Sequence, residues 1–304
     1  MSAVALSHPT VPLRRNVERP PLYPYVAMSP ALLLVASVSF LPLGYALVQS
    51  VYKSDYLQLG TFAGAGNYAY FLLGPDALPS IRASFAFVLG TIVISAPLGV
   101  GLALLLNQEI RFRSLFRTLL ILPWLVSALV GALLWSWLLN PSFSPAIQAL
   151  AALVQVRVPN PLTSFSLSMP ALVVAHSWSS YPMIMVFTLA ALQTVPNELI
   201  EAAHIDGANI WQRFAHVTFP YVKSTLFVAL VLTTLNTFNH VTMVLVMTGG
   251  GPIGTTETMS LRVFLEAFKY YRMGTASAGA VVIFCVNVLF ALVYARLLRE
   301  ENRV

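Results

Sequence analysis

Long, mostly apolar intervals without charge alternate with short charged segments along this chain. The intervals are residues 20–52, 83–108, 118–156, 158–197, 224–256 and 273–295. An α-helix needs about 20 consecutive apolar residues to cross the roughly 30 Å hydrocarbon core of a bilayer. The pattern therefore predicts an all-α integral membrane protein with six spanning helices, at about residues 26–50, 85–106, 119–139, 170–192, 226–247 and 278–298. Residues 56–75 are also uncharged, but their glycines predict a loop.

The basic residues predict how the spans are oriented. Eleven of the 17 Lys and Arg residues fall on one side of the predicted membrane, and the richer side is expected to be cytoplasmic. These residues are Arg14, Arg15, Arg19, Arg111, Arg113, Arg117, Arg213, Lys223, Arg296, Arg299 and Arg303. Both termini are then cytoplasmic. The chain divides into an N-terminal arm (1–25), a six-helix domain (26–298) and a cytoplasmic tail (299–304).

The composition supports a membrane protein. The chain is 58% hydrophobic and 9% charged, with a mean hydropathy of +0.77, whereas a soluble domain carries about 25% charged residues. Because the basic residues are scattered over short loops, the net charge of +6 reflects topology, and we predict no nucleic-acid partner. The lone Cys285 supports neither a disulfide nor a metal site.

Several function classes are disfavoured by motifs that the sequence lacks. None of the three lysines follows a glycine, as a Walker A phosphate-binding loop requires, so ATP hydrolysis by that route is not expected. All eleven Asp and Glu residues fall outside the predicted spans, which disfavours a proton relay built on carboxylates. The five histidines show no H-E-x-x-H spacing. We predict no catalytic residue and no metal ligand.

One polar segment, 197–220, separates two apolar intervals. Its pattern predicts two short helices with a turn at Gly207, and Pro220 is predicted to end the segment. Ala202 and Ala203 share a face on which another surface can approach closely. The apolar stripes of this segment could fold back on their own bundle, lie at the lipid interface, or bind a cytosolic partner.

These residues resemble the "EAA" coupling loop of binding-protein-dependent ABC importer permeases, in the form typical of the sugar branch. The matching residues are Glu201, Ala202, Ala203, Asp206, Gly207, Ala208, Phe214 and Pro220. The likeness extends to Phe62–Tyr68, to Leu122-Pro123-Trp124, and to Thr248–Pro252, which resembles an external loop of the maltose-permease F-type subunit. Ser224 and Ser144-Pro145-Ala146 depart from the family pattern.

The resemblance implies the type I ABC importer permease fold in a plasma (inner) membrane. It implies a second homologous permease subunit, an extracytoplasmic sugar-binding protein, and two cytosolic ATPase subunits that carry ATP and Mg, with no cofactor on this chain. Glu201 would pair with a basic group of the ATPase. The residues expected to contact the binding protein are Gly249, Gly250, Gly251 and Pro252.

Polar residues inside two predicted spans indicate a path for a solute. On the fifth span, Thr233, Asn236, Thr237 and His240 share a helical face, and Asn239 lies near its edge. The fourth span adds Ser177, Trp178, Ser180 and Tyr181. Amides, hydroxyls and aromatic faces suit a neutral, hydroxyl-rich ligand such as a sugar. The alternative is that these groups only hydrogen-bond between helices, at about 0.6 kcal/mol each.

Two other functions remain open at this stage. A sodium-coupled secondary transporter would import solute without partner subunits, although it leaves the EAA-like segment unexplained. An ABC permease for sulfate or phosphate would need a buried arginine or helix N-termini, and one for a polyamine would need acids. The middles of the predicted spans contain neither charge type, so neutral solutes fit better.

Overall fold

The computed structural model describes residues 23–56, 58–154 and 159–301. Most of the predicted arm and the last three residues of the predicted tail lie outside these ranges. The chain forms two compact units, which divide between Tyr45 and Ala46 within helix α1 (Tyr23–Ser50). In the first unit, α1 exposes apolar side chains such as Leu33, Phe40 and Leu41, as a helix surrounded by lipid does.

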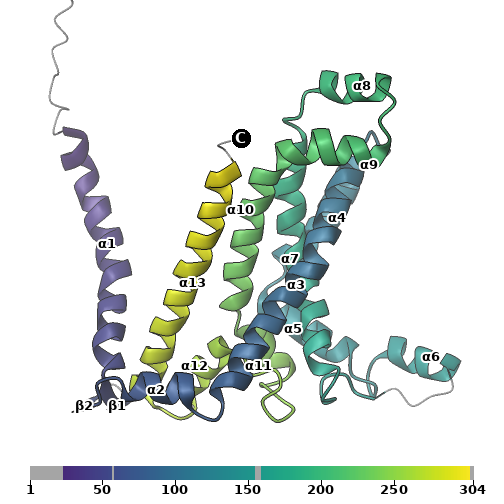
Figure 1. The fold of residues 1–304 in the computed structure, drawn as a ribbon. Helices are drawn as coiled ribbons and strands as arrows, with labels where there is room; N and C mark the ends of the chain where they lie inside the picture. The colour runs from purple at the N-terminus through teal and green to yellow at the C-terminus, as the bar shows by residue number, and fades with distance from the viewer. Residues whose placement is uncertain (1–22, 57, 155–158, 302–304) are drawn as a thin grey trace, which may run out of the picture. The chain divides into compact units, whose positions relative to one another are not determined.

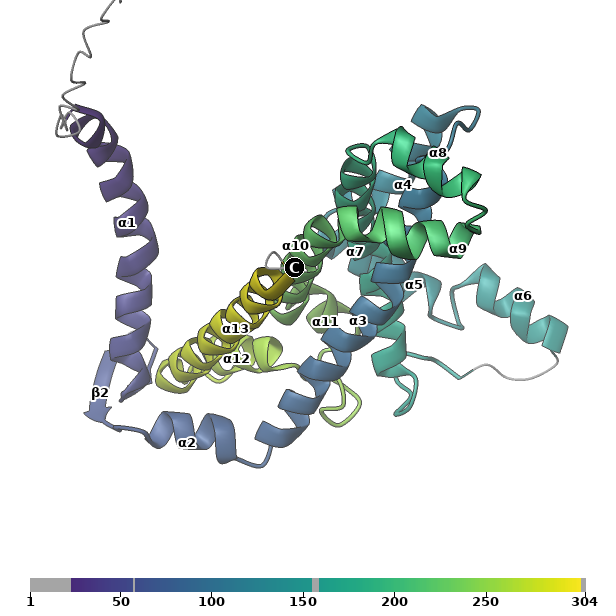
Figure 2. The ribbon, with the colours of Figure 1, turned by 45° about the horizontal axis from the view of Figure 1, so that its top comes forward.

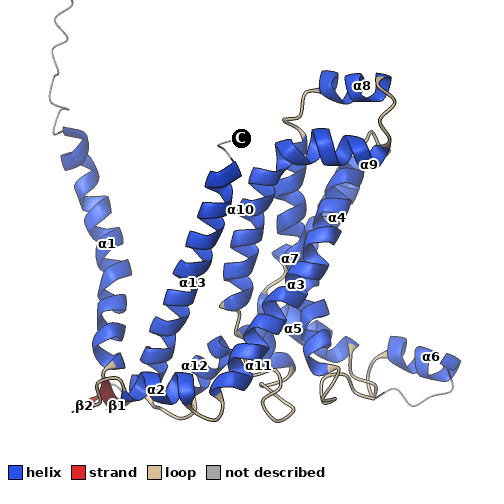
Figure 3. Ribbon diagram, in the orientation of Figure 1, coloured by secondary structure: helices blue, strands red, loops and turns tan. Residues whose placement is uncertain are grey.

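The second unit is almost entirely helical (Figures 1 and 3). Its elements are β1 (Tyr52–Asp55), β2 (Gln58–Phe62), α2 (Gly66–Leu73), α3 (Ala77–Leu106), α4 (Arg113–Leu125), α5 (Ala128–Leu138), α6 (Pro145–Val154), α7 (Ser168–Leu192), α8 (Asn197–Ile205), α9 (Ile210–Arg213), a π-helix (Phe214–Thr218), α10 (Phe219–Phe238), α11 (Thr242–Met247), α12 (Met259–Phe268) and α13 (Met273–Glu301). Over the described residues, five helices are long and apolar enough to cross a membrane, or six if α4 and α5 count as one broken span.

The third span is not the straight helix predicted at 119–139. Instead α4 and α5 meet at a 95° bend, where Val126 and Ser127 have extended backbones. Pro123 lacks the N–H that would continue the helical ladder, and the break faces a cavity, where irregular backbone is tolerated at membrane depth. Other spans keep a proline without breaking, as α3 does at Pro97 and α7 at Pro182, so Pro123 by itself did not predict this break.

The fifth span also differs from the prediction of one helix at 226–247. The chain is helical from Ile210 to Phe238, and a break at residues 239–241 separates this helix from α11. Pro220 was predicted to end the polar segment, but it lies inside this continuous helix, directly after the π-helix at Phe214–Thr218. The predicted end at Pro220 is therefore wrong.

Residues 56–75 are not the loop that their glycines suggested. They contain β2, which pairs antiparallel with β1, and the helix α2. Asn67 ties these elements together because its Nδ2 donates to the carbonyl oxygens of Ser50 and Tyr52, each at 2.8 Å. The hydroxyls of Tyr68 and Ser50 are also hydrogen-bonded, at 2.6 Å. The motif Phe62–Tyr68 thus has a structural role at the end of α1.

Helix α7 forms the centre of the second unit and packs along α3, α10 and α4. Two glycines of α3 allow the close contact: a Cβ at Gly90 would lie 2.9 Å from the side chain of Val173, and one at Gly99 would lie 2.9 Å from that of Ile184. The largest buried residues around this contact include Phe87, Leu172 and Met185. This rigid α3–α7 pair supports the polar side chains of α7 and α10.

At one end of the bundle, charged residues connect α12 with α2 and with Arg272, which directly precedes α13. Arg262 is 2% exposed and donates from Nη1 to the carbonyl oxygen of Phe71 at 3.0 Å, where the C-terminus of α2 favours a positive charge. Arg272 and Glu266 form an ion pair at 2.8 Å. Burial raises the pKa of Glu266, and the neighbouring arginines reduce this rise without reversing it.

Gly279 provides a test of this packing. A Cβ there would lie 2.6 Å from side-chain atoms of both Phe71 and Val263, and Phe71 is fully enclosed. We expect Gly279→Val to destabilise the folded chain by about 1–3 kcal/mol through overpacking. Thermal unfolding of the purified protein in detergent measures this. Gly101→Val is the control, since a Cβ at Gly101 meets nothing within 4 Å; equal unfolding midpoints for the two variants would contradict the expectation.

Candidate functional site

The polar segment 197–220 forms a helix–turn–helix at the end of the bundle where α13 also finishes (Figure 1). Helix α8 ends at Ile205, and Gly207 has a positive φ of 78°, a conformation that glycine adopts without steric cost. A capping box then starts α9: the amide of Gln212 donates to the Asn209 side chain, and the Asn209 amide donates to the Gln212 side chain. The predicted turn at Gly207 is confirmed.

Helices α8 and α9 contact each other at one end of the bundle (Figure 2), and they present both polar and apolar groups to their surroundings. Glu201 and Ala202 on α8 are exposed, and Ala203 is half-buried. A hollow of about 410 Å³ lies between α8 and the helix that follows. It is lined by Ala203, Asp206, Gly207, Ala208, Gln212, Arg213, His216 and Val217. Phe214 faces a second hollow of about 270 Å³ beside the ends of α3 and α7.

Large apolar side chains on the same segment have no cover within the described chain. Ile205 is 85% exposed, Ile210 65% and Trp211 78%. The sequence left three possibilities for the apolar residues of this segment: packing on their own bundle, contact with lipid, or binding of a partner. These three side chains do not pack on their own bundle. Such a patch beside an exposed carboxylate is suited to bind a partner or a lipid surface.

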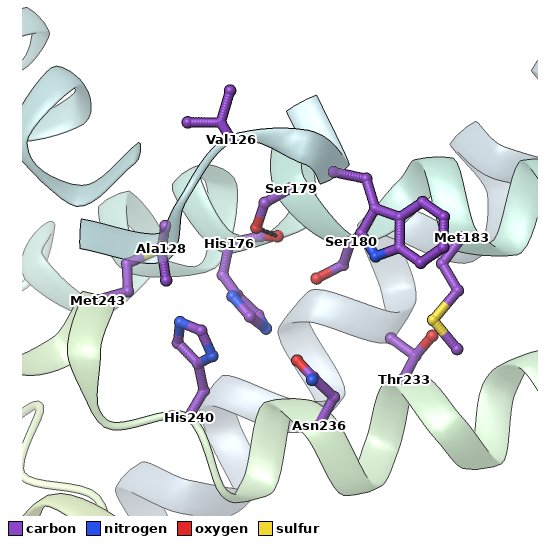
Figure 4. A pocket seen from close by; sticks show the side chains of 11 residues that line it. Val126, Ala128, His176, Ser179, Ser180, Met183, Thr233, Asn236, His240 and Met243 are labelled. Atoms are coloured by element: carbon purple, nitrogen blue, oxygen red, sulfur yellow. Dashed lines mark hydrogen bonds between the residues drawn. The ribbon is translucent and has the colours of Figure 1, made fainter. Parts of the chain in front are cut away.

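A cavity of about 150 Å³, with polar and apolar side chains in its wall, lies between α7, α10 and the breaks in the third and fifth spans (Figure 4). Its lining residues are Trp124, Val126, Ala128, His176, Ser179, Ser180, Met183, Thr233, Asn236, His240 and Met243. None of these side chains is an acid, a lysine or an arginine. The cavity can therefore offer hydrogen bonds from hydroxyl, amide and imidazole groups, together with an indole ring, and no fixed charge.

Four of the predicted path residues meet in this cavity. Ser180 comes from α7, Thr233 and Asn236 come from α10, and His240 comes from the break after α10. Figure 4 shows the side chains of Ser180, Asn236 and His240 turned toward a common space. The helical face predicted on the fifth span is thus partly directed at one cavity.

The other five predicted path residues do not line this cavity and bond elsewhere in the bundle. Ser177 donates to the Thr91 carbonyl at 3.4 Å, and Tyr181 donates to that of Leu120 at 3.0 Å. Asn239 donates to the Leu235 carbonyl and accepts from the Asn287 amide. The ring of Trp178 packs edge-on against that of Trp135. Thr237 is buried and contacts His176. Interhelical hydrogen bonding, the alternative weighed for these residues, describes most of them.

Sequence reasoning missed several lining residues. On α7, the missed residues His176, Ser179 and Met183 share one helical face with the predicted Ser180, because the four stand at positions i, i+3, i+7 and i+4. That spacing was a usable signal. Trp124, Val126, Ala128 and Met243 reach the cavity through the two helix breaks. No local sequence pattern predicts that these four residues line a cavity, because the two helix breaks were not predicted.

The predicted binding-protein contacts form a tight turn at the opposite end of the bundle from α8. Gly249 and Gly250 have φ values of 60° and 89°, and the peptide bond between Gly251 and Pro252 is cis. The hydroxyl of Thr256 donates to the Gly251 carbonyl at 2.7 Å and contacts the Thr248 hydroxyl at 2.8 Å. These contacts hold residues 248–256 in one shape.

Membrane-length helices around a polar cavity, with an exposed helix–turn–helix segment at one end, define an integral membrane transport subunit. The chain belongs to the family of binding-protein-dependent transport system inner membrane components, which residues 95–301 match. It is a multi-pass membrane permease, as the sequence motifs indicated.

Similar proteins carry the same assignment. The chain is 32% identical over 275 residues to the sn-glycerol-3-phosphate transport system permease protein UgpA of Brucella abortus, covering 88% of this chain and 91% of the relative. It is 31% identical to the trehalose/maltose transport system permease protein MalF of Thermococcus litoralis, covering 90% and 92%. A chain of a bacterial ABC transporter that imports the acidic polysaccharide alginate has a TM-score of 0.79 at 20% identity, covering 91% and 95%, which establishes the shared fold.

Proposed function

We propose that this chain is the permease subunit of an ATP-driven carbohydrate importer and forms half of its translocation pathway. The observation that carries the proposal is the cavity between α7 and α10, whose polar lining has hydroxyl, amide and imidazole groups but no charge. Neutral hydroxyl-rich solutes match such a lining. The printed functions of relatives, trehalose and maltose transport among them, agree with it.

The proposal includes partners that supply what this chain lacks. A second homologous permease completes the pathway, and an extracytoplasmic sugar-binding protein delivers the solute to the turn at Gly249–Pro252. Two cytosolic ATPase subunits bind ATP and Mg and dock on α8. The α8 end and both chain termini are then cytoplasmic, in accord with the distribution of Lys and Arg. A periplasmic protein is present in one solved structure of the alginate transporter.

Coupling in this scheme depends on the helix–turn–helix segment. Glu201 pairs with a basic group on the ATPase, while Ala202 and Ala203 allow its surface to approach α8 closely. The ATPase dimer closes on binding ATP and moves this segment. Since the segment continues through the π-helix into α10, the movement reaches Thr233 and Asn236 in the cavity wall. The cavity then alternates between its two openings, a two-state change biased by ligands at both ends.

The 32% identity to a glycerol-3-phosphate permease favours one second candidate, an importer of a phosphorylated polyol. A phosphate group carries a charge of about −1.5 to −2 at pH 7. A site for it within the membrane therefore needs an arginine, a lysine or helix N-termini. The cavity wall has no such basic side chain, although α5 begins at Ala128 and so brings one helix N-terminus to this wall. The lack of a basic side chain favours a neutral sugar as the solute.

Co-purification tests the proposed assembly. We expect the tagged chain, isolated from its native membrane in mild detergent, to bring a second permease and an ATPase, identified by mass spectrometry. Glu201→Lys should lose the ATPase and keep the permease, because reversing the charge replaces attraction by repulsion. Glu109→Lys, an exposed charge reversal outside the segment, should keep both. Recovery of the parent chain alone would instead support a secondary transporter.

A further inference from the structure

A second pocket, of about 350 Å³, lies at the end of the bundle opposite α8, between β1, α2 and the start of α13 (Figure 1). Its size falls within the range of about 300–1,000 Å³ that is usual for small-molecule sites. It shares no residue with the cavity between α7 and α10 or with the segment 197–220. The polar or charged wall residues used below are Lys53, Ser54, Asp55 and Arg272.

Backbone contacts hold the wall of this pocket in one shape. Asp55 and Arg272 form an antiparallel bridge, beside which the Tyr56 amide donates to the Tyr271 carbonyl oxygen at 3.1 Å. The rings of these two tyrosines stack with a centroid distance of 4.6 Å. Their φ values of 56° and 59° are uncommon for bulky residues. Gly274 lets α13 start against β1, because a Cβ there would overlap a carbonyl oxygen of that strand.

The wall offers positive charge and hydrogen-bond donors to an anion. Arg272 has five N–H groups. Its contacts with described residues use three of them: Nε and Nη2 bind Glu266 at 2.8 Å and 3.0 Å, and Nη1 donates to the Tyr70 hydroxyl at 3.1 Å. Two N–H groups remain. Lys53 adds a second cation, and the first turn of α13 adds the positive end of a helix dipole.

A buried hydroxyl in the same wall has no partner among the described residues. Ser54 is 2% exposed, and its Oγ makes no hydrogen bond there. A hydroxyl that is buried without a hydrogen bond is unfavourable. An acceptor oxygen on a ligand in the pocket would remove this cost.

A ligand that is only an anion does not match the whole wall, because Asp55 lines it too. Within the described ranges, neither Asp55 nor Lys53 forms an ion pair. A phosphate beside the two basic residues leaves the carboxylate of Asp55 for a positive group on the same ligand. The wall therefore fits a zwitterion that carries a phosphate and an ammonium.

The position of the pocket favours a ligand that comes from the bilayer. It lies where the spanning helix α13 begins, and further along this helix Phe284, Leu289 and Leu292 are exposed. Tyr70 and Tyr270 are partly exposed beside Arg272 and contact its guanidinium with their rings. Aromatic residues of this kind gather at the level of the lipid headgroups. Acyl chains could then lie along the apolar surface of α13.

We propose that this pocket binds the headgroup of an aminophospholipid such as phosphatidylethanolamine. The phosphate lies by Lys53 and Arg272 and accepts from the Ser54 hydroxyl. The ammonium donates to Asp55. Charge-assisted hydrogen bonds of both signs then join the lipid to β1 and to the start of α13.

Lipid binding to the purified full chain tests the proposal. Native mass spectrometry in detergent would measure the affinities for phosphatidylethanolamine, phosphatidylglycerol and phosphatidylcholine with identical acyl chains. We expect phosphatidylethanolamine to bind about 3-fold or more tightly than the other two, because only its ammonium has N–H groups for Asp55. Asp55→Asn should remove this preference, and Lys53→Gln should weaken the binding of all three lipids about 3-fold.

Asp76→Asn and Arg82→Gln are the matched controls and should bind lipid as the parent does, because both residues are exposed and lie outside the pocket. Asp55 and Lys53 are exposed as well, so all four variants should keep the parent's unfolding midpoint. Ser54→Ala removes only the unpaired hydroxyl and should weaken the binding of phosphatidylethanolamine about 3-fold. Unchanged binding in this variant would refute the role of Ser54.

Equal affinities of the parent for the three lipids, or an unchanged preference in Asp55→Asn, would overturn the inference. Water-soluble glycerophosphoethanolamine separates the two sources of this headgroup. If it binds as tightly as the lipid does, the pocket takes a soluble ligand and the lipid assignment is wrong. If Lys53→Gln loses affinity for an extracytoplasmic binding protein while its lipid binding is unchanged, the pocket is a protein contact and the inference also fails.

Discussion

Replacing Gly207 by valine should abolish most solute import while the chain still inserts and folds. Gly207 has a φ of 78°, and a β-branched residue there is strained by roughly 1–2 kcal/mol or more. A strain of that size lowers the population of the native turn about 5- to 30-fold. A Cβ at this position meets nothing within 4 Å, so the effect comes from the backbone and leaves the packing intact. Uptake of labelled solute, normalised to the amount of chain in the membrane, measures the loss.

Gly207→Asn is the matched control. Asparagine tolerates the left-handed conformation better than other residues with a side chain, and the space around Gly207 accommodates it. We expect this variant to retain most import. If the valine variant imports as fast as the parent at equal expression, the turn between α8 and α9 has no role in coupling, and the proposed mechanism is wrong.

Asn236→Trp should block the pathway while the subunits remain assembled. Asn236 is exposed in the cavity wall of the isolated subunit, so an indole ring can enter the cavity without displacing buried residues. The bulk added beside Ser180 and His240 leaves no room for a sugar ring in a cavity of about 150 Å³. We expect uptake to fall to the level of cells without the chain. The ATPase should still co-purify, because α8 is unchanged.

Leu289→Trp controls for the addition of an indole to a spanning helix. Leu289 lies on α13 and is 58% exposed, and it does not line the cavity. Its substitution should leave uptake near that of the parent. Normal uptake by Asn236→Trp would place the solute's route elsewhere and would remove the main support for a carbohydrate site between α7 and α10.

The helix–turn–helix segment was easier to predict from the sequence than the cavity. The helix–turn–helix segment is local: Gly207 determines the turn and Asn209 caps the next helix, so the interactions that shape it lie within a few residues. The cavity is assembled from helices far apart in the chain. His176 and Thr237 are 61 residues apart, and only the packing of α7 against α10 brings them together.

The sequence predicted four of the eleven residues that line the cavity and assigned five others to it that lie elsewhere. Helical spacing grouped Thr233 and Asn236 with Thr237. Thr237, however, contacts His176 of α7 and donates to the Thr233 carbonyl, so its hydrogen bonds lie within the bundle. The prediction passed over His176, although His176 and Ser180 share a face of α7. A polar residue on an apolar helix can face a neighbour or a cavity, and its position in the sequence does not distinguish the two.

The sequence by itself determined the membrane location, the approximate spans, the coupling-like segment and the absence of an ATP-binding loop, because hydrophobicity, charge and short motifs act over local stretches of chain. Only the tertiary structure decided that the third and fifth spans break, that the breaks lie beside His240, and that His176 lines the same cavity. Those features depend on which helices pack together, and a break at membrane depth is stable only where neighbouring helices and a polar cavity satisfy the freed backbone groups.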